Sequence, residues 1–138
     1  MTKRRYVVVG TGHRVRMYLG AMVRDHAEDA ELVGLIDPNP GRLQVHLDRL
    51  TAAGLDTADV LTGPPEDLEA VIAKGRADRA IITSPDVTHA ELIARCLDAG
   101  VDVVVEKPLT ISPDGTRTIA DAVARTGRDV VVTHNYRY

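Results

Sequence analysis

The sequence predicts an α/β fold, a doubly wound parallel sheet of the Rossmann type with about six strands and helices on both faces. Short β-branched runs alternate along the chain with segments in which apolar residues recur at helical spacing. That alternation is typical of a parallel sheet with right-handed crossovers. We expect strands at 5–9, 31–36, 58–61, 79–83, 101–105 and 129–133.

Each predicted helix between these strands carries one apolar stripe, which marks the buried face. The stripes are Val15, Tyr18, Leu19, Met22 and Val23; Leu43, Leu47 and Leu50; Leu68, Val71 and Ile72; Ile93, Ala94 and Leu97; and Ile119, Ala122 and Val123. Prolines typical of helix starts are Pro40, Pro64, Pro65 and Pro113. Glycines just past the stripes, where a helix end favours positive φ, are Gly54, Gly75, Gly100 and Gly127.

Composition bounds the functions that this chain can have. Its 138 residues suit one domain, 1–138, and its formal charge of −3 gives no basic footprint for nucleic acid. No apolar run approaches the roughly 18 residues that a membrane span needs. The five histidines are scattered, so we expect no metal site, and the single cysteine, Cys96, indicates a reducing compartment. We expect a cytoplasmic protein without membrane or nucleic-acid partners.

A glycine turn follows the first predicted strand. Gly10-Thr11-Gly12-His13-Arg14-Val15 matches the dinucleotide-binding pattern at its first two glycines. Gly10 allows the tight turn, and Gly12 lets the backbone approach a pyrophosphate at the N-terminus of the next helix. Val15 stands where the pattern has Gly or Ala, so we expect the helix to be pushed outward slightly. The alternative is a plain strand-to-helix turn.

An acidic residue, Asp37, ends the second predicted strand. Its carboxylate can accept hydrogen bonds from the adenosine ribose and would repel a 2′-phosphate, which favours NAD over NADP. Arg42 lies nearby and could pair with a 2′-phosphate, so NADP stays possible. The alternative is that residues 37–41 form only a polar turn.

The loops after the fourth and sixth strands add polar residues at the same sheet edge. Thr83-Ser84-Pro85-Asp86 and His89 could line the nicotinamide side of the crevice, or serve as helix caps and a structural histidine. Asn135 and Arg137 could face the cofactor, or belong to a solvated terminus.

Glu106-Lys107-Pro108 follows a valine-rich strand and contains the candidate for catalysis. A lysine fixed at a strand's carboxyl end can hydrogen-bond a substrate hydroxyl or carbonyl and help to move its proton during hydride transfer. Glu106 could orient Lys107 or cap nearby backbone groups. The alternative is a surface ion pair, worth about 0–1 kcal/mol.

Taken together, these motifs resemble the N-terminal domain of the Gfo/Idh/MocA oxidoreductases. The segments that carry the resemblance are Val9-Gly10-Thr11-Gly12, Asp37-Pro38-Asn39, Thr83-Ser84-Pro85-Asp86 with His89, Val105-Glu106-Lys107-Pro108-Leu109 and Asn135-Tyr136-Arg137. The resemblance implies NAD or NADP binding, reversible oxidation of a sugar, inositol or other polyol hydroxyl, and a catalytic role for Lys107. The predicted cofactor-binding residues are Gly10, Thr11, Gly12, His13, Arg14, Asp37, Arg42, Thr83, Ser84, Pro85, His89, Glu106, Lys107, Pro108, Asn135 and Arg137.

Members of that family continue into a substrate-binding domain, which also supplies much of the oligomer interface. This chain stops at Tyr138, where that domain would begin. We therefore expect either a piece of a longer, homo-oligomeric enzyme or a stand-alone domain with little turnover of its own. The alternative function is a non-catalytic dinucleotide-binding module for redox sensing or assembly. A methyltransferase is a weaker alternative, because that function would not explain the segment Glu106-Lys107-Pro108.

Overall fold

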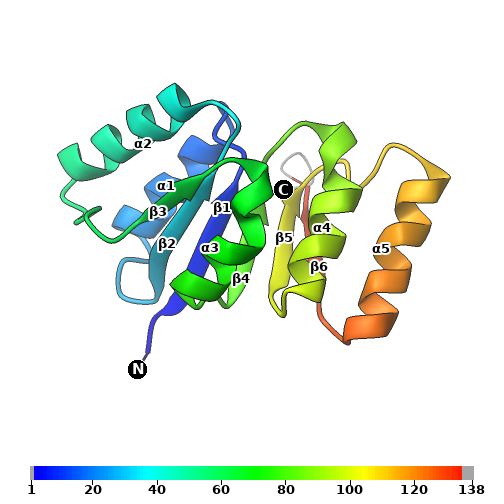
Figure 1. Cartoon of the computed structure of the whole chain (residues 1–138). Helices are drawn as coiled ribbons and strands as arrows, with labels where there is room; N and C mark the ends of the chain where they lie inside the picture. Colours follow the sequence, from blue (N-terminus) through cyan, green and yellow to red (C-terminus); the bar gives the residue numbers. More distant parts are fainter. Residues whose placement is uncertain (1, 135–138) are drawn as a thin grey trace.

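The computed structural model describes residues 2–134, which form one six-stranded parallel sheet with helices on both faces (Figure 1). The strands are β1 (Arg4–Val9), β2 (Ala30–Ile36), β3 (Leu61–Gly63), β4 (Arg79–Ile82), β5 (Asp102–Glu106) and β6 (Val130–Thr133). The helices are α1 (Val15–Arg24), α2 (Pro40–Ala52), α3 (Leu68–Gly75), α4 (His89–Asp98) and α5 (Pro113–Thr126), with 3₁₀ turns η1 (Pro65–Asp67) and η2 (Asp86–Thr88). The strand order is β3-β2-β1-β4-β5-β6. This arrangement confirms the predicted doubly wound fold.

Two hydrophobic cores lie on opposite faces of the sheet. Alternate residues of a strand point to opposite faces, so Val7 and Val9 pack with α3, α4 and α5, whereas Val8 packs with α1 and α2. Val15, the first residue of α1, has no exposed surface and packs in the same cluster as Val8 and Leu35. The core therefore accommodates the bulk that replaces the third glycine of the motif.

The third strand differs from its prediction. Strand pairing begins at Leu61, where residues 61–63 pair with Gly34–Ile36, and not at residue 58. The preceding segment turns instead, because Asp56 Oδ1 accepts the Ala58 N–H at 3.0 Å and the Val60 N–H donates to Thr57 O at 3.2 Å. The predicted strand over 58–61 therefore begins three residues too early, because this side-chain-stabilised turn precedes the strand.

One of the four predicted helix-ending glycines is also wrong. Gly54, Gly100 and Gly127 have positive φ, as expected, but Gly75 lies inside α3 and the left-handed residue is Arg76, with φ of 50°. Gly75 serves packing: a Cβ atom there would lie 3.0 Å from Val33 Cγ2 on β2. The absence of a side chain lets α3 approach the sheet closely.

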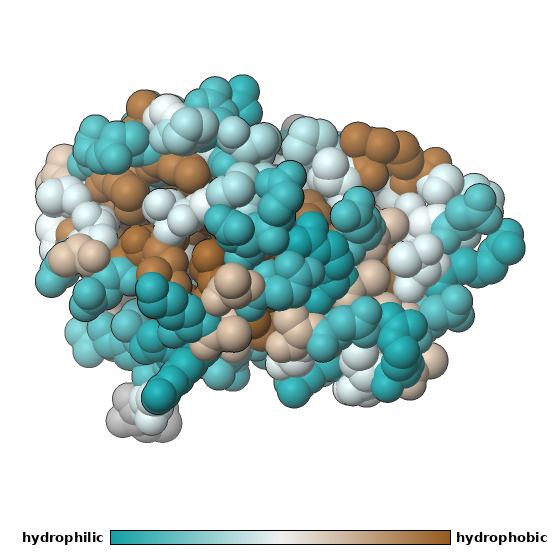
Figure 2. Space-filling view, in the orientation of Figure 1, coloured by the Kyte–Doolittle hydropathy of each residue, from teal (hydrophilic) through white to brown (hydrophobic). Residues whose placement is uncertain are grey.

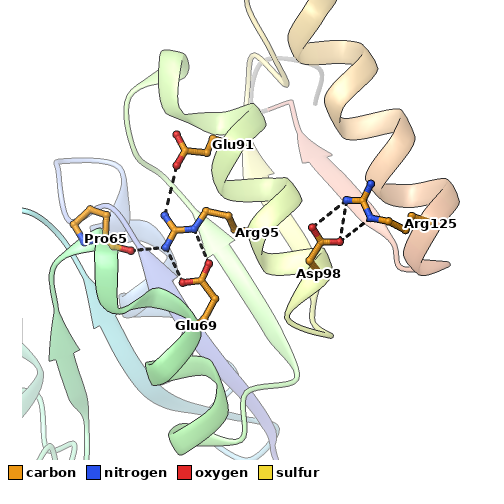
Figure 3. Close-up of polar contacts among 6 residues, drawn as sticks. All are labelled: Pro65, Glu69, Glu91, Arg95, Asp98 and Arg125. Atoms are coloured by element: carbon orange, nitrogen blue, oxygen red, sulfur yellow. Dashed lines mark hydrogen bonds and ion pairs between the residues drawn. The ribbon is translucent and has the colours of Figure 1, made fainter.

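Ion pairs connect α3, α4 and α5, the three helices on one face of the sheet (Figure 3). Arg95 of α4 donates two hydrogen bonds to the Glu69 carboxylate of α3, at 2.6 and 2.7 Å, and one to Pro65 O at 2.7 Å. Arg125 of α5 likewise holds Asp98 of α4. The hydrogen bonds from Arg95 lower the pKa of Glu69. These bidentate ion pairs fix the relative positions of the helices more than they stabilise the fold, since exposed ion pairs contribute about 0–1 kcal/mol.

The surface over these helices is mainly hydrophilic (Figure 2). Hydrophobic residues gather at the top right of this view, over the loop between β5 and α5, where Ile111 is 61% exposed. That loop lies at the carboxyl edge of the sheet, beside the predicted ligand crevice.

Candidate cofactor-binding site

The loops that follow β1 and β4 meet at the centre of the carboxyl edge. They lead to helices on opposite faces of the sheet, which makes this the switch point where ligands of such folds bind. Thr83 Oγ1 donates to Gly10 O at 2.7 Å, and the Thr83 N–H donates to Val9 O at 2.8 Å. A Cβ atom on Gly10 would lie 2.5 Å from Ser84 N. Gly10 therefore permits the close contact between the two loops.

The glycine loop after β1 has a backbone geometry suited to binding an anion. Gly10 has a φ of +92°, a conformation that side-chain-bearing residues seldom adopt. A Cβ atom on Gly12 would meet none of the described atoms within 4 Å, so a ligand can approach the backbone there. His13 and Arg14 are exposed directly before α1 begins. The N–H groups at this helix start and the Arg14 guanidinium favour a bound phosphate.

Asp37 holds the glycine loop in place from the end of β2. Its Oδ2 accepts the Thr11 N–H at 2.8 Å and its Oδ1 accepts the Asn39 N–H at 2.8 Å, while the residue is only 5% exposed. Each carboxylate oxygen can accept a further hydrogen bond, so a ribose hydroxyl can still bind. Arg42 is exposed in the first turn of α2. The predicted ribose residue therefore also shapes the phosphate loop.

A histidine that the sequence reasoning missed contacts the same loop. His46 of α2 is 5% exposed, and its Nε2 donates to Thr11 O at 2.9 Å. Burial lowers the pKa of His46, and the cationic Arg49 and Arg16 lower it further, while the hydrogen bond to Thr11 and the Asp37 carboxylate oppose them. Thr11 Oγ1 is buried without a hydrogen-bond partner among the described residues. The signal available in the sequence was a polar residue three positions after Leu43, on the apolar stripe of its helix.

The loop after β4 is tied to the loop after β5 through His89. This residue begins α4 and has no exposed surface. Its Nδ1 lies 2.7 Å from Pro108 O and its Nε2 lies 3.0 Å from Ser84 O. The Ser84 hydroxyl lies 2.7 Å from Thr88 Oγ1, and Pro85 is exposed. His89 is thus placed behind the crevice, where it positions both loops, and Thr83, Ser84 and Pro85 are nearer the surface.

Glu106, Lys107 and Pro108 lie at the end of β5, where the prediction put them. Glu106 is 5% exposed, Lys107 is exposed, and the Lys107–Pro108 peptide bond is cis. The Tyr18 hydroxyl of α1 donates to Glu106 Oε1 at 2.7 Å and lies 3.0 Å from Thr133 Oγ1 of β6. In the sequence, Tyr18 belongs to an apolar stripe, which does not indicate this polar contact. Burial raises the pKa of Tyr18 to about 12, and the Glu106 carboxylate adds to the rise.

Some predictions lie beyond these contacts. Asn135 and Arg137 fall outside the described residues. Within residues 2–134, no group of three or more His, Cys, Asp or Glu residues could hold a metal ion. The described helices include none that is both long and apolar enough to cross a membrane.

The fold and these loops define a dinucleotide-binding domain of the doubly wound class. Residues 4–134 match the family described as oxidoreductases with an NAD-binding Rossmann fold, Gfo/Idh/MocA. The chain belongs to this family. The glycine loop after β1, with its open space at Gly12 and Asp37 beside it, fits the NAD that the family description names.

Individual relatives agree with this assignment. Inositol 2-dehydrogenase 1 from Saccharopolyspora erythraea is 32% identical over 136 residues, which cover 95% of this chain and 36% of that protein. The WlbA dehydrogenase from Bordetella pertussis, solved with NADH and UDP-GlcNAcA, superposes with a TM-score of 0.82 at 27% identity and covers 100% of this chain and 38% of its own. The Thermus thermophilus WlbA, solved with NAD and UDP-GlcNAcA, gives 0.75 at 26% identity, covering 94% and 41%. The chain thus spans 36% to 41% of the length of these relatives.

Proposed function

We propose that this chain is the cofactor domain of an NAD-dependent dehydrogenase that acts on a hydroxyl of a sugar, inositol or related polyol. The family, the open space at Gly12 and the nearby exposed Arg14 support the cofactor half of the proposal. The substrate half is supported by the position of Lys107 and by relatives named as inositol dehydrogenases. Activity would require a further domain to hold the substrate.

The exposed Lys107 carries the chemical part of the proposal. When bound, the nicotinamide ring accepts or donates the hydride. Lys107 would hydrogen-bond the reacting oxygen through Nζ and help to move its proton while the hydride is transferred. Glu106, the residue before this lysine, is buried and accepts a hydrogen bond from the Tyr18 hydroxyl. His89 fixes the carbonyl of the residue after it, so the lysine lies between two anchored neighbours.

Cofactor binding is tested by titrating NADH and NADPH into the purified chain and following cofactor fluorescence. The chain has no Trp, so protein emission interferes little. Gly12→Ala is expected to keep the free energy of unfolding within about 0.5 kcal/mol of the wild type, since the Cβ atom meets open space. The same change should weaken the affinity for NADH by at least about tenfold. Gly20→Ala, where the new Cβ atom meets only the flexible Arg24 side chain, is the matched control. Equal NADH affinity in the wild type, Gly12→Ala and Gly20→Ala would overturn the site.

The catalytic role is tested in a protein that carries this chain followed by a substrate-binding domain. Lys107→Ala is expected to lower kcat by roughly a hundredfold or more, within the range of general acid–base effects, while NADH affinity stays within about twofold. Lys74→Ala, an exposed lysine on α3, is the control and should change neither quantity. A near-normal kcat in Lys107→Ala would exclude this role, and NADH binding with no turnover of any polyol would favour a redox-sensing or assembly module.

The proposal extends to the setting of the protein. We propose a cytoplasmic, homo-oligomeric enzyme, in keeping with the reduced, buried Cys96 and with the cellular NAD pool that such an enzyme uses. Cell fractionation and light scattering of the protein in solution would test these two statements.

A further inference from the structure

We propose that His46 is a positioning residue for the cofactor, holding the phosphate loop through the Thr11 carbonyl so that the Gly12 N–H faces the ligand. This inference rests on the proposed NAD-binding function of the loop. It concerns a residue of α2 whose side chain is itself buried and removed from the crevice surface.

The first support is that both sides of Thr11 are held by side chains. Its N–H donates to Asp37 Oδ2 at 2.8 Å, and its carbonyl accepts from His46 Nε2 at 2.9 Å. Thr11 is 2% exposed, so neither bond competes with bulk water. Loop residues are ordinarily mobile, whereas these two bonds fix Thr11 to β2 and α2.

The second support is the geometry of the peptide unit. In a planar trans peptide, the C=O of one residue and the N–H of the next point in opposite directions. Because His46 holds the Thr11 carbonyl toward α2, the Gly12 N–H is turned away from α2. A Cβ atom on Gly12 would meet no described atom within 4 Å, so a pyrophosphate can approach the backbone at this residue.

The third support is the chemistry of the histidine. The Thr11 oxygen is a carbonyl and can only accept, so Nε2 carries a hydrogen. A neutral ring with hydrogen at Nε2 satisfies this buried carbonyl without placing a charge in the core. Leu or Phe at position 46 would fill the space and leave the carbonyl without its donor.

The experiment compares His46→Leu, His46→Gln and Leu50→Ala in the 138-residue chain. Leu removes the donor at similar size, whereas the Gln amide can donate to the same carbonyl. Leu50 is buried on the next turn of α2, so Leu50→Ala loosens the helix without touching Thr11. NADH titration and amide hydrogen exchange at Thr11, followed by NMR, are the two readouts.

His46→Leu is expected to weaken the affinity for NADH about tenfold, equivalent to about 1.4 kcal/mol of binding free energy. It should also speed hydrogen exchange of the Thr11 amide about tenfold. His46→Gln should restore both quantities to within about threefold of the wild type, and Leu50→Ala should leave NADH affinity unchanged. His46→Leu behaving like Leu50→Ala, or His46→Gln behaving like His46→Leu, would overturn the inference. A wild type that binds no NADH, with Thr11 exchange still dependent on position 46, would refute the proposed function while leaving the loop contact intact.

Discussion

Replacing Tyr18 by Phe removes one hydroxyl from the junction of α1, β5 and β6. The hydroxyl donates to Glu106 Oε1 at 2.7 Å, and Glu106 is 5% exposed. A hydrogen bond to a charged group contributes about 1.5–3 kcal/mol, so we expect a loss near 2 kcal/mol in the free energy of unfolding. For 138 residues at about 2.1 cal/mol/K each, the entropy of unfolding is about 0.29 kcal/mol/K, and Tm should fall by about 7 °C.

The matched control is Tyr6→Phe, because Tyr6 is half-buried in β1 and its hydroxyl makes no hydrogen bond within residues 2–134. Urea denaturation and thermal melts of the two variants measure the difference. Equal losses in Tyr18→Phe and Tyr6→Phe would refute the reasoning, since they would show that the Glu106 contact contributes nothing.

The Tyr18 hydroxyl should also affect how the stability of the protein depends on pH in alkaline solution. With its pKa raised from 10.0 to about 12, Tyr18 holds its proton more tightly in the folded state than in the unfolded state. Its contribution is therefore fully present below pH 10 and is lost as the pH rises toward 12. Tyr18→Phe should lose stability less steeply than the wild type between these pH values, and a parallel decline would exclude Tyr18 as the source.

Two further predictions concern the buried cysteine of α4 and the first glycine of the loop after β1. Burial raises the pKa of the Cys96 thiol to about 12, so a thiol reagent at pH 8 should label Cys96 only as fast as the chain unfolds, and rapid labelling of the native protein would contradict this placement. Gly10→Ala should lower the free energy of unfolding by about 3 kcal/mol or more, because the positive φ is strained and the new Cβ atom meets the backbone of Ser84; a urea titration showing a loss below about 1 kcal/mol would show that the loops separate easily.

The fold could be predicted from the sequence because its signals are local. Alternating β-branched runs and apolar stripes indicate strands and helices over windows of five to fifteen residues, roughly the length of one element. The placement of Lys107 followed from the same logic, since it comes directly after a buried strand and strand ends meet at one edge. The error at β3 was local too, because a side-chain turn precedes the strand. The error at Gly75 was not, because the close contact there is with Val33, a residue distant in the chain.

The supporting residues of the site could not be predicted in this way, because their partners are distant in the chain. His46 contacts a residue 35 positions away and Tyr18 one 88 positions away. Both occupy the apolar stripe of a helix, and a stripe reports only that its face is buried. A polar group on such a face must nevertheless find a hydrogen-bond partner, because leaving it unsatisfied costs about 1–3 kcal/mol.

In a doubly wound fold, irregular backbone at the carboxyl edge supplies such partners, since strand ends and loops there have carbonyls and N–H groups outside the sheet ladder. The contacts fit this reasoning: His46 binds the loop after β1, and His89, at the start of α4, lies against carbonyls in the loops after β4 and β5. Tyr18 contacts the same edge but binds a side chain there, the Glu106 carboxylate at the end of β5. A polar residue on a buried helix stripe, within reach of the carboxyl edge, is therefore a sequence signal for a loop-positioning residue. The His46 variants test that rule directly, because Gln keeps the donor and Leu keeps only the bulk.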